Sequence, residues 1–297
     1  MKKFKAMIIA TLVAFTSTAW AVGIGSGQPG GTNYPMVTDI VKVCSVPGRE
    51  LQNVQSDGSL DNINKVYREK LTQFSIAQTD ALFYMKGNDP KMMDRIVMIF
   101  PLFSTEIQIV VAQNSPIKTL ADLAGKRVIE GPGDTSGTWV TSQVIKKLIG
   151  VDWIPMNASI SDGAKAVASG QADAEIVVAG APVDALAKTP GLRLIPLTHP
   201  ALDGFSLYTK AIIPSNTYPN QASAISTYKV DNAMITYAYK SQYQKEIGDF
   251  VGCITKNIET LQQIGHPKWR DVDPLDIDRI KWPAHPAATA AIKKYSK

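Results

Sequence analysis

The chain has 297 residues, 45% of them apolar and 19% charged, with a formal net charge of +5. Because single hydrophobic cores stop growing near about 250 residues, we expect two lobes rather than one. The small charge excludes nucleic acid and anionic membrane surfaces as partners that bind through bulk electrostatics.

The first 21 residues have the pattern of a secretory signal peptide. Lys2, Lys3 and Lys5 precede an apolar run over residues 6–15, which is too short to span a bilayer. Ala19-Trp20-Ala21 follows as a small-x-small cleavage site. We therefore expect residues 1–21 to be removed by cleavage after Ala21, leaving a periplasmic protein whose net charge falls from +5 to +2.

Strands and helices then alternate along the chain. Runs of β-branched and other apolar residues predict buried strands, and capped amphipathic segments between them predict helices. The expected strands are residues 22–24, 51–54, 74–77, 96–100, 107–112, 127–129, 174–178, 193–197, 208–213 and 225–230. The expected helices are residues 36–43, 61–70, 120–123, 138–148, 161–168, most of 232–264, and 286–295.

This alternation indicates an α/β fold. No low-complexity linker separates the two expected lobes, so they must share strands. We expect the chain to cross near Ala112 and to return near Ser206. The first lobe then comprises residues 22–112 and 206–297, and the second, inserted lobe comprises residues 113–205.

Glycine-rich turns occur at three strand-to-helix junctions, in residues 25–30, 56–62 and 131–138. The first reads G-x-G-x-x-G, but Pro29 interrupts it and an exported protein has no access to nicotinamide cofactors, so no cofactor is expected. The third lacks the Gly-Lys-Ser/Thr ending of a nucleotide-hydrolysing loop. A tight surface turn explains the first junction by itself and ordinary N-capping explains the second, but three such junctions in two lobes indicate a small ligand held between the lobes.

The order of these segments resembles the TAXI family of solute-binding proteins, which serve tripartite ATP-independent periplasmic (TRAP) transporters. The similar segments span nearly the whole chain after the signal peptide. They are Gly25-Ser26-Gly27 through Gly30-Gly31-Thr32-Asn33-Tyr34-Pro35, Asp57-Gly58-Ser59-Leu60-Asp61-Asn62 with Gln78-Thr79-Asp80, Gly131-Pro132-Gly133-Asp134-Thr135-Ser136-Gly137-Thr138, Asp173-Ala174 with Gly180-Ala181-Pro182, residues 213–219, and Pro283-Ala284-His285-Pro286-Ala287. Asp134 departs from the family pattern by adding an acid.

The resemblance implies a type II periplasmic-binding-protein fold, with two α/β lobes joined by two hinge strands. It implies a small organic anion or amino acid as ligand, with a glutamate-like carboxylate favoured, and an integral-membrane TRAP subunit as partner of a monomeric binding protein. The ligand contacts carried over from the family are Thr32, Tyr34, Gly58, Ser59, Gln78, Thr79, Ser136, Gly137 and Thr138.

No catalytic or metal-binding constellation stands out, so we expect neither an enzyme nor a metal site. His199, His266 and His285 each precede proline, which favours extended or turn positions over paired helical ligands. Cys44 and Cys253 form a disulfide or remain two separately buried thiols, because spacing alone does not fix the geometry. Two other functions stay open: a binding protein for an ATP-driven importer, and a ligand-presenting periplasmic sensor.

Overall fold

The computed structural model describes residues 21–69 and 72–296, so the predicted signal peptide lies outside the described residues except for Ala21. The strands are β1 (Val22–Gly25), β2 (Leu51–Val54), β3 (Thr72–Gln78), β4 (Ile96–Ala112), β5 (Arg127–Ile129), β6 (Ile154–Met156), β7 (Ala174–Ala179), β8 (Leu192–Ile195), β9 (Tyr208–Ile213) and β10 (Ile225–Tyr237). Their order in the sheet is β2-β1-β3-β10-β4-β7-β5-β6, with β8 also beside β4 and β9 beside β10.

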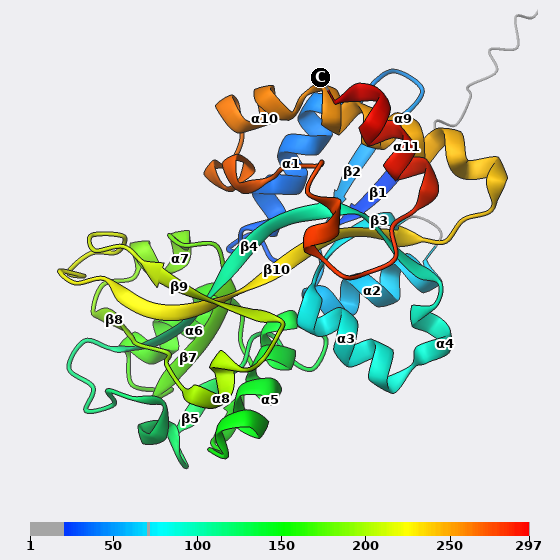
Figure 1. The fold of residues 1–297 in the computed structure, drawn as a ribbon. Helices are drawn as coiled ribbons and strands as arrows, with labels where there is room; N and C mark the ends of the chain where they lie inside the picture. The colour runs from blue at the N-terminus through cyan, green and yellow to red at the C-terminus, as the bar shows by residue number, and fades with distance from the viewer. Residues whose placement is uncertain (1–20, 70–71, 297) are drawn as a thin grey trace, which may run out of the picture.

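Helices cover this sheet in both lobes (Figure 1). The α-helices are α1 (Asn33–Cys44), α2 (Ser59–Arg68), α3 (Thr79–Asn88), α4 (Pro90–Met93), α5 (Gly137–Ile149), α6 (Ile160–Ala168), α7 (Asp184–Lys188), α8 (Pro200–Asp203), α9 (Gln244–Lys256), α10 (Ile258–Ile264) and α11 (Pro286–Tyr295). Short 3-10 helices are η1 (Leu120–Leu123), η2 (Ser241–Tyr243), η3 (Pro267–Asp271) and η4 (Ile277–Arg279). None of the helices in the described part of the chain has the length and apolar character needed to cross a membrane.

Two long strands, β4 and β10, run through both lobes and join them (Figure 1). They are antiparallel partners at the crossing, where Thr105 lies opposite Val230 and Ser104 opposite Asp231. Two separate strands were expected over residues 96–112, and a helix was expected to begin at Asn232. Both expectations were wrong, because β4 is continuous through Pro101 and β10 continues to Tyr237.

The hydrophobic clusters divide within these two strands rather than at Ala112 and Ser206. Residues 96–103 of β4 and 233–235 of β10 pack in the first lobe, beneath α1 and α9 on one face and α2 and α3 on the other. Residues 107–111 and 225–230 pack in the second lobe, together with Tyr208. We therefore propose a first lobe of residues 22–104 and 232–296 and a second lobe of residues 107–230.

Local sequence explains where the helices that face the lobe interface begin and end. In α1, Met36, Val37, Ile40 and Cys44 are buried, with the spacing of one helical face. Helix α5 begins where the Ser136 hydroxyl accepts a hydrogen bond from the backbone N–H of Trp139 at 3.0 Å. It ends at Gly150, which adopts the left-handed conformation (φ +69°) that glycine tolerates.

A disulfide joins α1 to α9 within the first lobe. Cys44 and Cys253 are bonded across 209 residues of sequence, with their Cα atoms 5.9 Å apart. Of the two arrangements left open by the sequence, the structure has the bonded one. The covalent link ties the two chain segments that make up the first lobe to each other.

Candidate functional site

A small cavity of about 70 Å³ lies between the lobes, beyond the carboxyl ends of the parallel strands. This edge is where open α/β sheets bind ligands, because loops and helix N-termini converge there. Both lobes contribute to the lining, which comprises Gly27, Gln28, Gly31, Thr32, Asn33, Asp57, Gly58, Ser59, Gln78, Thr105, Gly131, Pro132, Ser136, Gly137, Thr138, Ile160, Ile176, Val178, Ala179 and Asn232.

Seven of the nine predicted contact residues line this cavity: Thr32, Gly58, Ser59, Gln78, Ser136, Gly137 and Thr138. The other two, Tyr34 and Thr79, lie outside the lining. Asp134 also lies outside it, as do Tyr84 and Trp139, whose rings pack against each other. The Tyr34 carbonyl instead accepts a hydrogen bond from the Asn53 amide at 2.9 Å. Tyr34 and Thr79 are therefore not part of the candidate site.

The first lobe presents the start of α2 to the cavity. Gly58 has φ +131°, a conformation that side chains rarely adopt, and it precedes the first helical residue, Ser59. The Ser59 hydroxyl accepts a hydrogen bond from the Gln78 backbone N–H at 3.1 Å and donates one to Gln78 Oε1 at 3.3 Å. These bonds fix the two side chains relative to each other on the wall of the cavity.

The electrostatics of the cavity come from backbone dipoles rather than from basic side chains. Among the described lining residues there is no lysine, arginine or histidine, and Asp57 is the one charged residue. Helices α1, α2 and α5 all begin at the cavity, with Asn33, Ser59 and Gly137 as their first residues. The first-turn N–H groups of a helix lack intrahelical acceptors and carry a partial positive charge, so these three termini favour a small anion.

The lobes contact each other directly around this cavity, so the structure is a closed arrangement. The backbone N–H of Asp61 in α2 donates to the carbonyl of Thr135 in the second lobe at 2.9 Å. The Thr135 hydroxyl donates to Asp57 Oδ2 at 3.2 Å. Gly137 lies against Gln78 so closely that a Cβ atom there would be 1.6 Å from Gln78 Oε1.

A buried carboxylate beside the cavity also links the lobes. Asp80, in α3 of the first lobe, is 2% exposed. Its Oδ2 accepts hydrogen bonds from the hydroxyl of Thr141 at 2.6 Å and from the hydroxyl of Tyr208 at 2.9 Å, both in the second lobe. Burial raises the pKa of Asp80, and burial together with the nearby Asp80 charge raises the pKa of Tyr208. Asp80 was noted in the sequence only as part of a similar segment, and its role as an inter-lobe contact was missed.

A further inter-lobe contact, an ion pair, lies at the crossing of the hinge strands. Lys268 Nζ, in η3 of the first lobe, is 2.9 Å from Glu106 Oε1 in β4. The other oxygen of Glu106 accepts a hydrogen bond from the backbone N–H of Ala181 at 2.8 Å. Glu106 therefore holds one group from each lobe at once.

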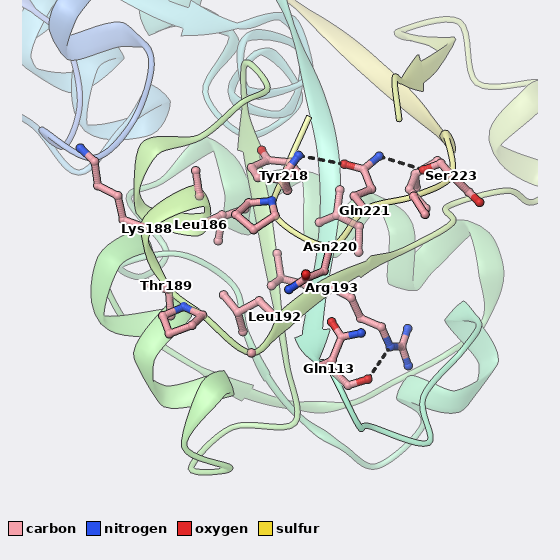
Figure 2. Close-up of a pocket in the computed structure, with 18 residues that line it drawn as sticks. Gln113, Leu186, Lys188, Thr189, Leu192, Arg193, Tyr218, Asn220, Gln221 and Ser223 are labelled. Carbon is pink, nitrogen blue, oxygen red and sulfur yellow. Dashed lines mark hydrogen bonds between the residues drawn. The ribbon is translucent and has the colours of Figure 1, made fainter. Parts of the chain in front are cut away.

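A larger hollow of about 620 Å³ lies on the second lobe, away from the inter-lobe cavity (Figure 2). It is bordered by the end of α7, by β8 and by residues 218–225. Two of its polar side chains are engaged with nearby backbone. Arg193 donates to the carbonyls of Gln113, Ser115 and Ile117, and Gln221 donates to those of Ile213, Pro214 and Ser223. A ligand there would not bridge the lobes, so the smaller cavity is the candidate site.

The fold is shared with several solved proteins. One described as a periplasmic transporter has a TM-score of 0.55 at 13% identity, over 93% of each chain. A ligand-binding component of an ABC-type import system from Staphylococcus aureus, with zinc bound, has a TM-score of 0.52 at 12% identity, over 92% of this chain and 83% of that one. XAC2383 from Xanthomonas citri, bound to ATP, has a TM-score of 0.51 at 10% identity, over 94% of this chain and 100% of that one.

At these identities the likeness establishes the fold alone, and it confirms the expected α/β architecture of the periplasmic-binding-protein type. The family is identified by sequence. A model of the NMT1-like family matches residues 24–295, which include both lobes and both hinge strands. The chain therefore belongs to the NMT1-like family.

Proposed function

We propose that this protein is a periplasmic solute-binding protein that holds a small organic anion between its lobes and catalyses no reaction. The observation that carries this proposal is a cavity at the lobe interface where three helix N-termini meet and no described basic side chain is present. Helix N-termini supply N–H donors to an anion without a counter-charge. Such a site suits reversible capture, because the ligand leaves no uncompensated buried cation behind.

The size of the cavity limits the ligand. A volume of about 70 Å³ holds only a few waters, since a cavity needs about 10–15 Å³ of such space for each one. A ligand with more than a few non-hydrogen atoms therefore enters only when the lobes move apart. A carboxylate as large as glutamate would hold the lobes further apart than they are here, whereas a two- or three-carbon acid requires a small displacement.

Closure follows from ligand binding in this proposal. With the lobes apart, the N–H groups of α2 and α5 are solvated separately, and an anion that bonds to both favours the closed form by its differential affinity. The inter-lobe contacts of Asp80 and Glu106 then reinforce that form. The closed surface is what a membrane partner would recognise.

Native mass spectrometry of the protein purified from the periplasm tests the proposal. A small anion released on mild denaturation is expected, and adding it back should raise the unfolding temperature and reduce the radius of gyration measured by X-ray scattering. The proposal is overturned if the protein carries no ligand and no short-chain carboxylate changes either quantity.

We propose a TRAP-type membrane subunit as the transport partner, on the basis of the sequence resemblance. The Staphylococcus aureus neighbour belongs to an ABC-type import system, which makes an ATP-driven importer the second candidate. Uptake of the identified ligand into membrane vesicles separates the two. Transport driven by an ion gradient without ATP supports the first, and transport that requires ATP supports the second. Ligand binding without any transport partner would favour a periplasmic sensor.

A further inference from the structure

Asn232 lies beside the cavity, in the middle of hinge strand β10. It is 1% exposed and belongs to the cavity lining. It lies directly opposite Gln78 in the antiparallel pairing of β10 with β3. Opposite residues of such a pair place their side chains on the same face of the sheet, so Asn232 shares the cavity face with Gln78.

Neighbouring groups fix the orientation of the Asn232 amide. Its Nδ2 donates to the carbonyl of Phe103 at 3.2 Å and to Thr105 Oγ1 at 3.2 Å. The Thr105 hydroxyl in turn donates to the carbonyl of Val230 at 3.4 Å. Because the Phe103 carbonyl can only accept, the amide nitrogen must face it, and a flipped amide would place two oxygens together.

This orientation leaves the Asn232 Oδ1 atom without a partner. Oδ1 is buried and accepts no hydrogen bond from any described residue. The same is true of Asn33 Oδ1, in another residue of the cavity lining. Buried acceptors are nearly always satisfied in folded proteins, so an unsatisfied one at a cavity wall indicates a donor that arrives with a ligand.

We infer that Asn232 Oδ1 determines specificity by accepting a hydrogen bond from a hydroxyl or amino group of the ligand. The inference rests on the proposed function, in which the helix N-termini hold the carboxylate. Because the cavity is so small, the donor group must lie close to that carboxylate, on the adjacent carbon atom. The ligand class is therefore a 2-hydroxy or 2-amino acid, and acids without a donor at that carbon leave Oδ1 unsatisfied.

Isothermal titration with four acids of one three-carbon skeleton tests the inference: propionate, pyruvate, L-lactate and L-alanine. L-Lactate or L-alanine should bind at least tenfold more tightly than propionate and pyruvate. Asn232→Leu, which keeps the approximate shape but removes the amide, should abolish this preference. The matched control Asn53→Leu removes an asparagine outside the cavity, one that bonds to Tyr34 and Thr38, and should keep it.

Asn232→Asp provides a second route if the leucine variant does not fold, which its melting temperature will show. The carboxylate keeps acceptors at the same place and adds a negative charge, so L-alanine should gain affinity relative to L-lactate. Equal binding of all four acids to the wild type overturns the inference and leaves the proposed function standing. A preference that persists in Asn232→Leu overturns the role of Asn232. An absence of binding by every acid overturns the inferred ligand class, whereas the proposed function fails only if the purified protein also releases no small anion.

Discussion

Gly137→Ala tests whether close approach of the lobes at the cavity is needed for tight binding. The alanine Cβ would lie 1.6 Å from Gln78 Oε1 and 2.7 Å from Ser59 Oγ, whereas ordinary contact begins at 3.4 Å. The lobes must therefore separate by almost 2 Å at this point, or the bonded Gln78 and Ser59 side chains must move. Gly137 is not among the glycines with positive φ, so alanine strains only the contact and not the backbone.

Overpacking of a tight contact costs about 1–3 kcal/mol. If that cost falls on the closed form alone, ligand affinity decreases by about 5- to 150-fold. The melting temperature of the ligand-free protein should hardly change, because alanine is favourable at a helix start and the lobes can separate without unfolding.

Titration calorimetry with the ligand released from the purified protein measures this loss, and X-ray scattering measures the closure. Gly248→Ala is the matched control, since no atom lies within 4 Å of a Cβ at that helical position. Wild-type affinity together with wild-type compaction in Gly137→Ala would refute the idea that the high-affinity state is the closed form described here.

Three further predictions concern stability. Thr141→Val removes a hydrogen-bond donor from buried Asp80 and should lower the free energy of unfolding, measured in urea, by about 1–3 kcal/mol. Because this contact crosses the lobes, the substitution should also weaken ligand binding. Unchanged affinity would mean that the contact does not contribute to closure of the lobes. Burial raises the pKa of Glu175 well above 4.5, and its Oε2 atom has no hydrogen-bond partner among the described residues. The contribution of Glu175 to stability is therefore complete below pH 4.5, and it is lost as the pH rises through the raised pKa. Glu175→Gln should therefore raise the melting temperature more at pH 8 than at pH 5, and an equal effect at both would contradict the assigned cause. Replacing Cys44 and Cys253 by alanine should lower the free energy of unfolding by about 2–5 kcal/mol. Ligand affinity should stay within about twofold, because the disulfide lies within one lobe, away from the cavity. Equal urea midpoints for the wild type and the double variant would contradict the expected loss of stability.

Much of the candidate site could be predicted because its parts are local in sequence. Gly58 and Ser59, and likewise Ser136 and Gly137, each belong to a strand–turn–helix junction whose function follows from a few adjacent residues. Such junctions place N–H groups at a sheet edge wherever they occur. The α/β fold followed from the same alternation.

The hinge strands could not be predicted in full, because tertiary pairing decides them. Asp231 and Asn232 are two adjacent polar residues inside β10, and the sequence indicated that the strand ends before them, at Val230. In the structure Asp231 lies opposite Ser104 and Asn232 opposite Gln78. Partners more than 100 residues away thus extend the strand, and local propensity carries no information about them.

The inter-lobe contacts were missed for the same reason. Asp80 meets Thr141 and Tyr208, which lie 61 and 128 residues away in sequence. A single acid at the start of a helix normally indicates a cap or a favourable dipole interaction. Nothing nearby in the sequence distinguishes it from a carboxylate that is buried between two lobes.

The path of the chain through the hinge sets an order of assembly during synthesis. The second lobe is one continuous segment, residues 107–230, whereas the first lobe needs residues 232–296 to supply α9, α11 and the second half of the disulfide. A chain that emerges from its amino terminus can therefore complete the second lobe while the first still lacks residues 232–237, the part of β10 that lies between β3 and β4. Until then the edges of β3 and β4 that face each other in the first lobe have no strand between them, so the unfinished first lobe is the part of the molecule that most needs protection by chaperones during synthesis.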